Sequence, residues 1–89
     1  MGFRYKKGIG VPYNQQGWIY FYCLQYRTLP RKEREKIRKL CRDVGGEYAG
    51  ALLEFVTSEK GYTAICMKYH LSQATLYRLV KKFYEGFSR

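Results

Sequence analysis

The sequence predicts an all-α fold, a small bundle of short helices. The chain has 89 residues, which suits one domain. Hydrophobic residues make up 46% of it, and that share is too high for a disordered chain. Apolar side chains recur at helical spacing through the C-terminal part of the chain. Only one segment resembles a strand, and it has no partner strand to pair its backbone groups.

Residues 1–16 are predicted to form a flexible basic arm, and residues 17–89 a single helical domain. Glycines and proline favour irregular structure in the arm. The apolar run Trp18–Tyr26 fits either a buried strand or a buried helix, because periodicity cannot separate the two in so short a segment. We favour a helix at Gln15–Arg27, since a lone strand would leave its backbone groups unpaired. The basic residues of the arm are Arg4, Lys6 and Lys7.

The next two predicted helices span Pro30–Val44 and Glu47–Ser58. Proline suits the first turn of a helix, where its missing N–H is no loss. Gly45 and Gly46 are typical of a helix C-terminus, and they separate the two segments. Both segments carry apolar residues at helical spacing, which indicates that one side of each helix faces inward. The stripe residues are Ile37, Leu40, Cys41 and Val44 in the first, and Tyr48, Ala51, Leu52, Phe55 and Val56 in the second.

From Thr63 onward the sequence predicts a short helix, a turn and a longer helix. Thr63 is expected to cap the short helix, Ala64–Tyr69, and Ser72 to cap the longer one. His70 stands where the chain must turn. The longer helix has apolar residues at spacings of three and four, which predicts a buried stripe. That stripe comprises Leu76, Leu79, Val80 and Phe83, and Phe87 extends it.

The opposite face of this longer helix is small and polar at its start and basic further on. A short helix, a turn and a second helix make a helix-turn-helix, in which the start of the second helix enters the DNA major groove. Gln73, Thr75 and Arg78 have side chains that can read base edges. Lys81 and Lys82 stand further along, where phosphates would pass. The face holds Ala74, Arg78, Lys81 and Glu85, flanked by Tyr77 and Lys82.

The stretch TAICMKYHLSQATLYRLVKKF, which begins at Thr63, resembles the helix-turn-helix units of homeodomain-like transposases, invertases and repressors. The matched positions are Ile65, Cys66, Leu71, Ser72, Thr75, Leu76, Tyr77 and Arg78. The resemblance covers residues 47–85 if the helix at 47–58 is the first of a trihelical unit, with the helix-turn-helix itself at 62–84. His70 departs from the glycine usual in the turn, and Cys66 replaces alanine. The resemblance implies binding of duplex DNA, in transcriptional regulation or in mobile-element recombination or transfer.

Charge agrees with a polyanionic partner. The chain carries 17 Lys and Arg against 7 Asp and Glu, a net charge of +10. Such a field attracts nucleic acids, and it does not by itself choose between DNA, RNA and an acidic membrane. The basic arm adds a candidate minor-groove contact. The residues predicted to contact DNA are Ser72, Gln73, Ala74, Thr75, Tyr77, Arg78, Lys81, Lys82, Lys68, Arg4, Lys6 and Lys7.

Other functional classes have weaker support in the sequence. Three widely spaced cysteines do not form a disulfide framework or a zinc-binding pattern, so reduced, buried thiols are expected. With one histidine and no acidic cluster, we expect no catalytic residues, no metal and no cofactor. No apolar run is long enough to span a membrane, and no secretory signal begins the chain, so a cytoplasmic location is expected.

Two alternatives to DNA binding remain open at this level. The Tyr- and Trp-rich N-terminal half would make the chain a protein-interaction module if it docks a protein partner or a second copy, with a helix-turn-helix that is structural only. Exposed aromatic side chains would instead suit RNA, whose unpaired bases stack on them.

Overall fold

The computed structural model describes residues 8–87, and the described part of the chain is all helical, as the sequence predicts. Two single turns of 3₁₀-helix, Tyr26–Thr28 and Gly46–Tyr48, connect longer elements. None of the helices in the described range combines the length and hydrophobicity needed to cross a membrane. The α-helices are α1 (Tyr13–Leu24), α2 (Arg31–Gly45), α3 (Ala49–Val56), α4 (Tyr62–Tyr69) and α5 (Gln73–Phe87).

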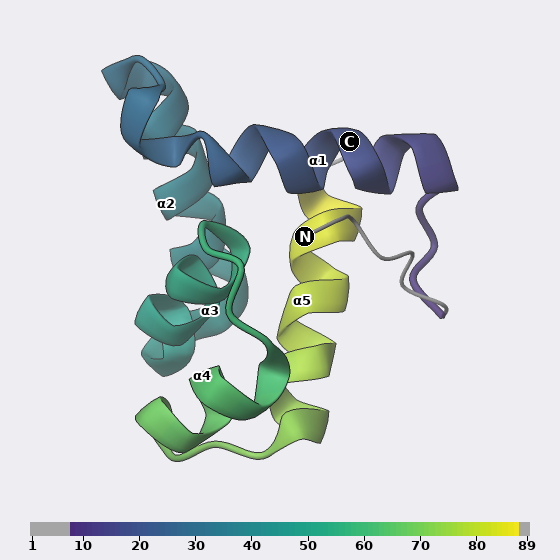
Figure 1. The fold of residues 1–89 in the computed structure, drawn as a ribbon, viewed down its shortest axis with the longest axis vertical. Coiled ribbons are helices and arrows are strands. Elements are labelled where there is room, and N and C mark those ends of the chain that lie inside the picture. The colour runs from purple at the N-terminus through teal and green to yellow at the C-terminus, as the bar shows by residue number, and fades with distance from the viewer. Residues whose placement is uncertain (1–7, 88–89) are drawn as a thin grey trace.

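The helices form a bundle that α1 closes at one end. α1 lies across the C-terminal end of α5, and the turn between α4 and α5 lies at the opposite end of the molecule (Figure 1). α2 packs against both α3 and α5, and α4 packs against α3 and α5. The three helices α3, α4 and α5 therefore form a connected unit, and α1 and α2 cover it.

A single hydrophobic core receives side chains from all five α-helices. Burial of these apolar side chains is the main favourable contribution to folding. Burial also raises the pKa values of the Cys23 and Cys41 thiols to about 12, so both stay protonated at neutral pH. The largest fully buried apolar side chains are Ile19, Ile37, Leu52, Ile65, Leu76, Val80 and Phe83.

The described residues 8–16 pack on the bundle, and the arm predicted over residues 1–16 is wrong for this part; residues 1–7 lie outside the described residues. Ile9 and Val11 are buried in the core. Gln16 is fully buried as well, and its side-chain amide donates to the Val11 carbonyl at 2.9 Å. The backbone N–H of Gly10 donates to Oε2 of Glu85 at 3.0 Å, so the segment is attached to α5. Ile9 lies between Gly8 and Gly10, and Val11 lies between Gly10 and Pro12, which is why composition alone suggested an irregular arm.

Several predicted boundaries shift by a few residues. α1 spans Tyr13–Leu24 and not Gln15–Arg27, because the chain tightens into a 3₁₀ turn after Leu24. α3 spans Ala49–Val56 and not Glu47–Ser58, because Gly46–Tyr48 also forms a 3₁₀ turn. The predicted stop of α2 is confirmed: Gly46 follows the helix with a φ of +55°, a region that favours glycine.

Candidate nucleic-acid interface

A three-residue turn joins α4 to α5, and its geometry depends on His70. This residue adopts the left-handed conformation, with φ 57° and ψ 49°. The N–H of Leu71 donates to the Cys66 carbonyl at 3.1 Å, the bond that commonly closes a helix C-terminus of this kind. Histidine tolerates the left-handed region better than most residues do. The turn predicted at this position is therefore made without glycine.

Ser72 caps α5, as the sequence predicts. Its Oγ accepts a hydrogen bond from the Thr75 N–H at 3.1 Å and donates to Oγ1 of Thr75 at 2.9 Å. The bond from the Thr75 N–H satisfies one of the backbone N–H groups that the start of a helix leaves without a partner. The cap predicted at Thr63 is wrong. Helix α4 starts at Tyr62, after Gly61, and the Thr63 hydroxyl instead accepts a bond from the Gln73 side chain at 3.2 Å.

The buried stripe of α5 is rotated slightly from the predicted one. Leu76, Val80 and Phe83 are fully buried, as expected, but Leu79 is only half-buried and Tyr84 is buried in its place. Tyr84 lies on the side of α5 that meets α1, close to Tyr20 and Cys23. Burial raises the pKa of the Tyr84 hydroxyl.

The rotation determines which predicted contact residues face solvent. Along α5, the exposed side chains lie in the middle of the outward face and half-buried ones lie at its edges. Arg4, Lys6 and Lys7 lie outside the described residues. Among the described residues that were predicted to contact DNA, the exposed ones are Lys68, Ser72, Gln73, Ala74, Arg78 and Lys82, and the half-buried ones are Thr75, Tyr77 and Lys81.

Arg78 and Lys82 form the basic part of this face. They lie one turn apart, and among the described residues neither forms a salt bridge. A guanidinium nitrogen of Arg78 makes only a long contact of 3.5 Å to Oγ1 of Thr75. Ala74 begins the face with a side chain too small to obstruct a ligand. Cationic groups of this kind, on a helix surface with an open start, suit a polyanion.

The N-terminal segment borders this face at Tyr77. Gly8 has a φ of +82°, and a Cβ added to it would lie 2.7 Å from the Tyr77 hydroxyl oxygen. The segment continues along α5 to the Gly10–Glu85 hydrogen bond. Tyr77 is therefore part of a contact between two chain segments, and not only a flank of an exposed helix face as predicted. The described chain begins beside α5.

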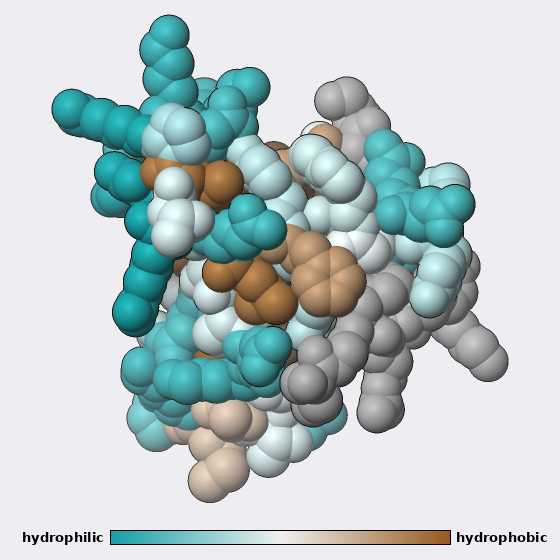
Figure 2. Space-filling model, turned by 45° about the horizontal axis from the view of Figure 1, so that its top comes forward, coloured by the Kyte–Doolittle hydropathy of each residue, from teal (hydrophilic) through white to brown (hydrophobic). Residues whose placement is uncertain are grey.

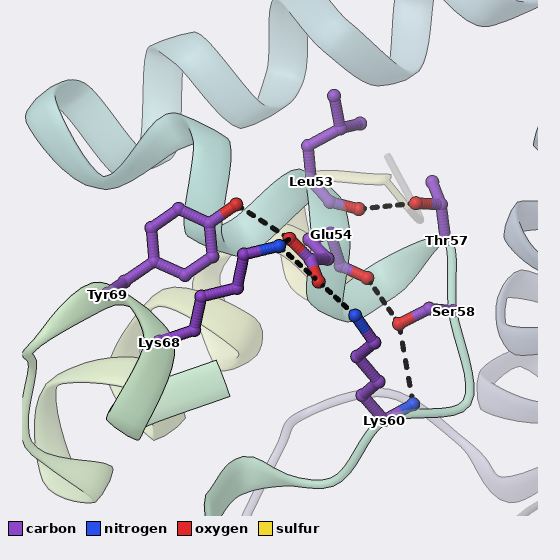
Figure 3. Close-up of polar contacts among 7 residues, drawn as sticks. All are labelled: Leu53, Glu54, Thr57, Ser58, Lys60, Lys68 and Tyr69. Atoms are coloured by element: carbon purple, nitrogen blue, oxygen red, sulfur yellow. Dashed lines mark hydrogen bonds and ion pairs between the residues drawn. The ribbon is translucent and has the colours of Figure 1, made fainter. Parts of the chain in front are cut away.

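A network around Glu54 fixes α4 against α3. The Glu54 carboxylate, on α3, lies 2.6 Å from Nζ of Lys60 and 2.9 Å from Nζ of Lys68 (Figure 3). The Tyr69 hydroxyl donates to the same carboxylate at 2.7 Å. These donors, led by the bond to Lys60, lower the pKa of the Glu54 carboxyl to about 2. The network orients α4, and with it the turn that leads into α5.

The same network changes the role of Lys68. The sequence places Lys68 among the DNA contacts, but its ammonium is already paired with Glu54 and lies 5.6 Å from the centroid of the Tyr69 ring. Sequence reasoning did not find Glu54, because its partners lie up to 15 residues away and follow no helical spacing. The one signal in the sequence that could have indicated the role of Glu54 was its acidic side chain on a predicted helix of a strongly basic protein.

Comparison with known proteins returns no match. No family model, no curated protein and no solved structure matches the chain. Over residues 8–87, no group of three His, Cys, Asp or Glu side chains is arranged to hold a metal ion.

Proposed function

We propose that this protein binds duplex DNA in a sequence-specific manner, with the start of α5 in the major groove. The observation that carries the proposal is the outward face of α5, where exposed Arg78 and Lys82 follow a small, capped helix start. The net charge of +10 supports it, because a positive field raises the rate of encounter with a polyanion.

Each residue of the face has a distinct role in this proposal. Arg78 donates to acceptors on a guanine edge, and Gln73 exchanges its bond with Thr63 for a bond to a base. Ala74 lets the helix backbone approach the floor of the groove. Lys82 pairs with a phosphate, and phosphate contacts set the register of the protein without reading sequence.

The basic residues Arg4, Lys6 and Lys7 are proposed to follow the DNA into the adjacent minor groove. The position of Gly8 supports this, because Gly8 lies beside Tyr77 at the edge of the α5 face. A narrow minor groove has an enhanced negative potential that attracts such side chains. The proposal thus combines a helix in one groove with an arm in the next.

The biological role that fits this activity is transcriptional regulation, or an accessory function in mobile-element recombination or transfer. The resemblance of the α4–α5 sequence to homeodomain-like transposases, invertases and repressors supports both roles equally. The proposal places the protein in the cytoplasm, in accord with three cysteines that are free and buried. It requires no cofactor, metal or catalytic residue.

Selection from a random duplex library tests the proposal. We expect one enriched motif for the native protein, and a loss of about 1–3 kcal/mol of specific binding for Arg78→Ala with relaxed preference at one or two positions. Arg38, exposed on α2, gives a matched control, because Arg38→Ala removes the same charge from another surface. Absence of any enriched motif, or tighter binding of single-stranded RNA than of duplex DNA, would contradict the proposal.

A further inference from the structure

The outward face of α1 exposes large aromatic side chains. Tyr13, Trp18 and Phe21 are 60%, 58% and 49% exposed. They border a shallow hollow that also includes Asn14, Gly17, Tyr22 and Gln25. Isolated exposed aromatics are ordinary, but a contiguous group of them on one helix face indicates an interaction surface.

This face is uncharged in a strongly basic protein. The sequence of α1, YNQQGWIYFYCL, contains no acidic or basic residue, although the chain as a whole has a net charge of +10. In Figure 2 the longest hydrophilic side chains gather at the upper left of the view. Figure 1 places the start of α2 on that side. An acidic partner would be drawn to the basic surfaces and not to α1.

The side chains along the face are spaced symmetrically. Asn14, Trp18, Phe21 and Gln25 follow one another at steps of four, three and four residues, a pattern that reads the same in both directions. Two copies of such a helix, related by a two-fold axis, would match end to end. Gly17, next to Trp18, leaves room for a second helix to approach.

We propose that this face binds the same face of a second copy, with the two α1 helices antiparallel. Trp18 packs against the partner's Phe21, and Asn14 lies opposite the partner's Gln25. Side-chain amides both donate and accept hydrogen bonds, so this pair is satisfied without charge. A self-complementary contact of this kind is the usual interface of a two-fold dimer. Because both faces are neutral, two basic chains meet here without opposing like charges.

The aromatic groups are already held in place for such a contact. Trp18 stacks on Tyr22 with ring centroids 4.9 Å apart, and its ring lies 5.9 Å from that of Phe87. The Tyr22 hydroxyl donates to the Glu33 carboxylate on α2. A side chain that is ordered before binding loses less conformational entropy on association. Trp18 is therefore suited to be the anchor of the interface.

The dimer leaves the candidate DNA interface open. α1 lies at the end of the bundle opposite the turn that leads into α5 (Figure 1). The inference does not depend on the proposed DNA binding, and it is tested with the protein alone.

Sedimentation velocity over a wide range of concentrations tests the dimer, with the fluorescence of Trp18 as a second readout. Trp18 is the single tryptophan of the chain, so its emission reports on this face alone. We expect the mass to rise to that of two chains, and the emission to shift to shorter wavelength as Trp18 is buried. High salt should favour the dimer, because it screens the repulsion between two positively charged copies.

Phe21→Glu and Met67→Glu make a matched pair. Both replace an exposed apolar side chain by a carboxylate, but Met67 lies on α4 and is 73% exposed. Phe21→Glu should remain a monomer over the same range, whereas Met67→Glu should dimerise like the native chain. The proposal is overturned if the native chain stays a monomer, if Phe21→Glu dimerises normally, or if mass doubles with no change in Trp18 emission.

Discussion

Replacement of Leu76 by alanine tests which face of α5 points into the core. Leu76 is fully buried, and it lies on α5 two residues before Arg78, the exposed residue on which the proposed reading face depends. If the helix were rotated so that Leu76 faced solvent, Arg78 could not occupy the middle of the outward face. The stability of the Leu76 variant therefore reports on the geometry of the candidate interface.

The expected magnitude follows from the burial of the side chain. Leu76→Ala removes three carbon atoms, and transfer of each from the core to water costs about 0.8 kcal/mol. The unfilled cavity adds to this, so the expected loss is about 3 kcal/mol, at the lower end of measured Leu-to-Ala values in protein cores. A domain of this size has few kcal/mol to spare, because native proteins are only marginally stable.

Urea unfolding followed by circular dichroism measures this loss, and Leu79→Ala is the matched control. Leu79 is half-buried on the same helix, so the identical substitution should cost roughly 1 kcal/mol. The slope of the free energy against urea should be the same for both variants. Equal losses at the two positions, or a larger loss at Leu79, would refute this orientation of α5.

Two further predictions concern the elements that position α5. Ser72→Ala removes the cap of the helix and should lower the free energy of unfolding by about 1 kcal/mol, measured in urea; an unchanged value would mean that the cap is not formed in solution. The lowered pKa of Glu54 should stabilise the fold fully above about pH 4.5, with the benefit lost as pH falls toward about 2. In thermal melts, Glu54→Gln should lose less stability than the native chain as the pH falls from about 4.5 toward about 2. If the variant and the native chain lose the same stability over this range, Glu54 does not stabilise the fold through its ionised carboxylate.

Local signals in the sequence predicted the fold class and the start of α5. The hydroxyl of Ser72 and the positive φ of His70 depend on neighbours within a few residues, so a linear reading can find them. Gly46 ends α2 for the same reason. Backbone geometry at helix ends is a local property, and residue type determines much of it.

Contacts between distant segments were not predictable in this way. The hydrogen bond from Gly10 to Glu85 spans 75 positions, and no periodicity within either segment indicates it. That contact explains why residues 8–16 are part of the domain. The pairing of Lys68 with Glu54 is likewise invisible to a reading of α4 alone, in which an exposed lysine appears available for DNA.

The salt dependence of duplex binding tests the central proposal most directly, with Lys82→Ala compared against Lys32→Ala. Both lysines are exposed, and each substitution removes one charge, but Lys32 lies on α2. We predict that log K falls linearly with log salt for the native chain, that Lys82→Ala lowers the slope by about one, and that Lys32→Ala leaves it unchanged. A native chain that does not bind duplex DNA, or a slope reduced by Lys32→Ala and not by Lys82→Ala, would contradict the assignment of α5 as the DNA-binding helix.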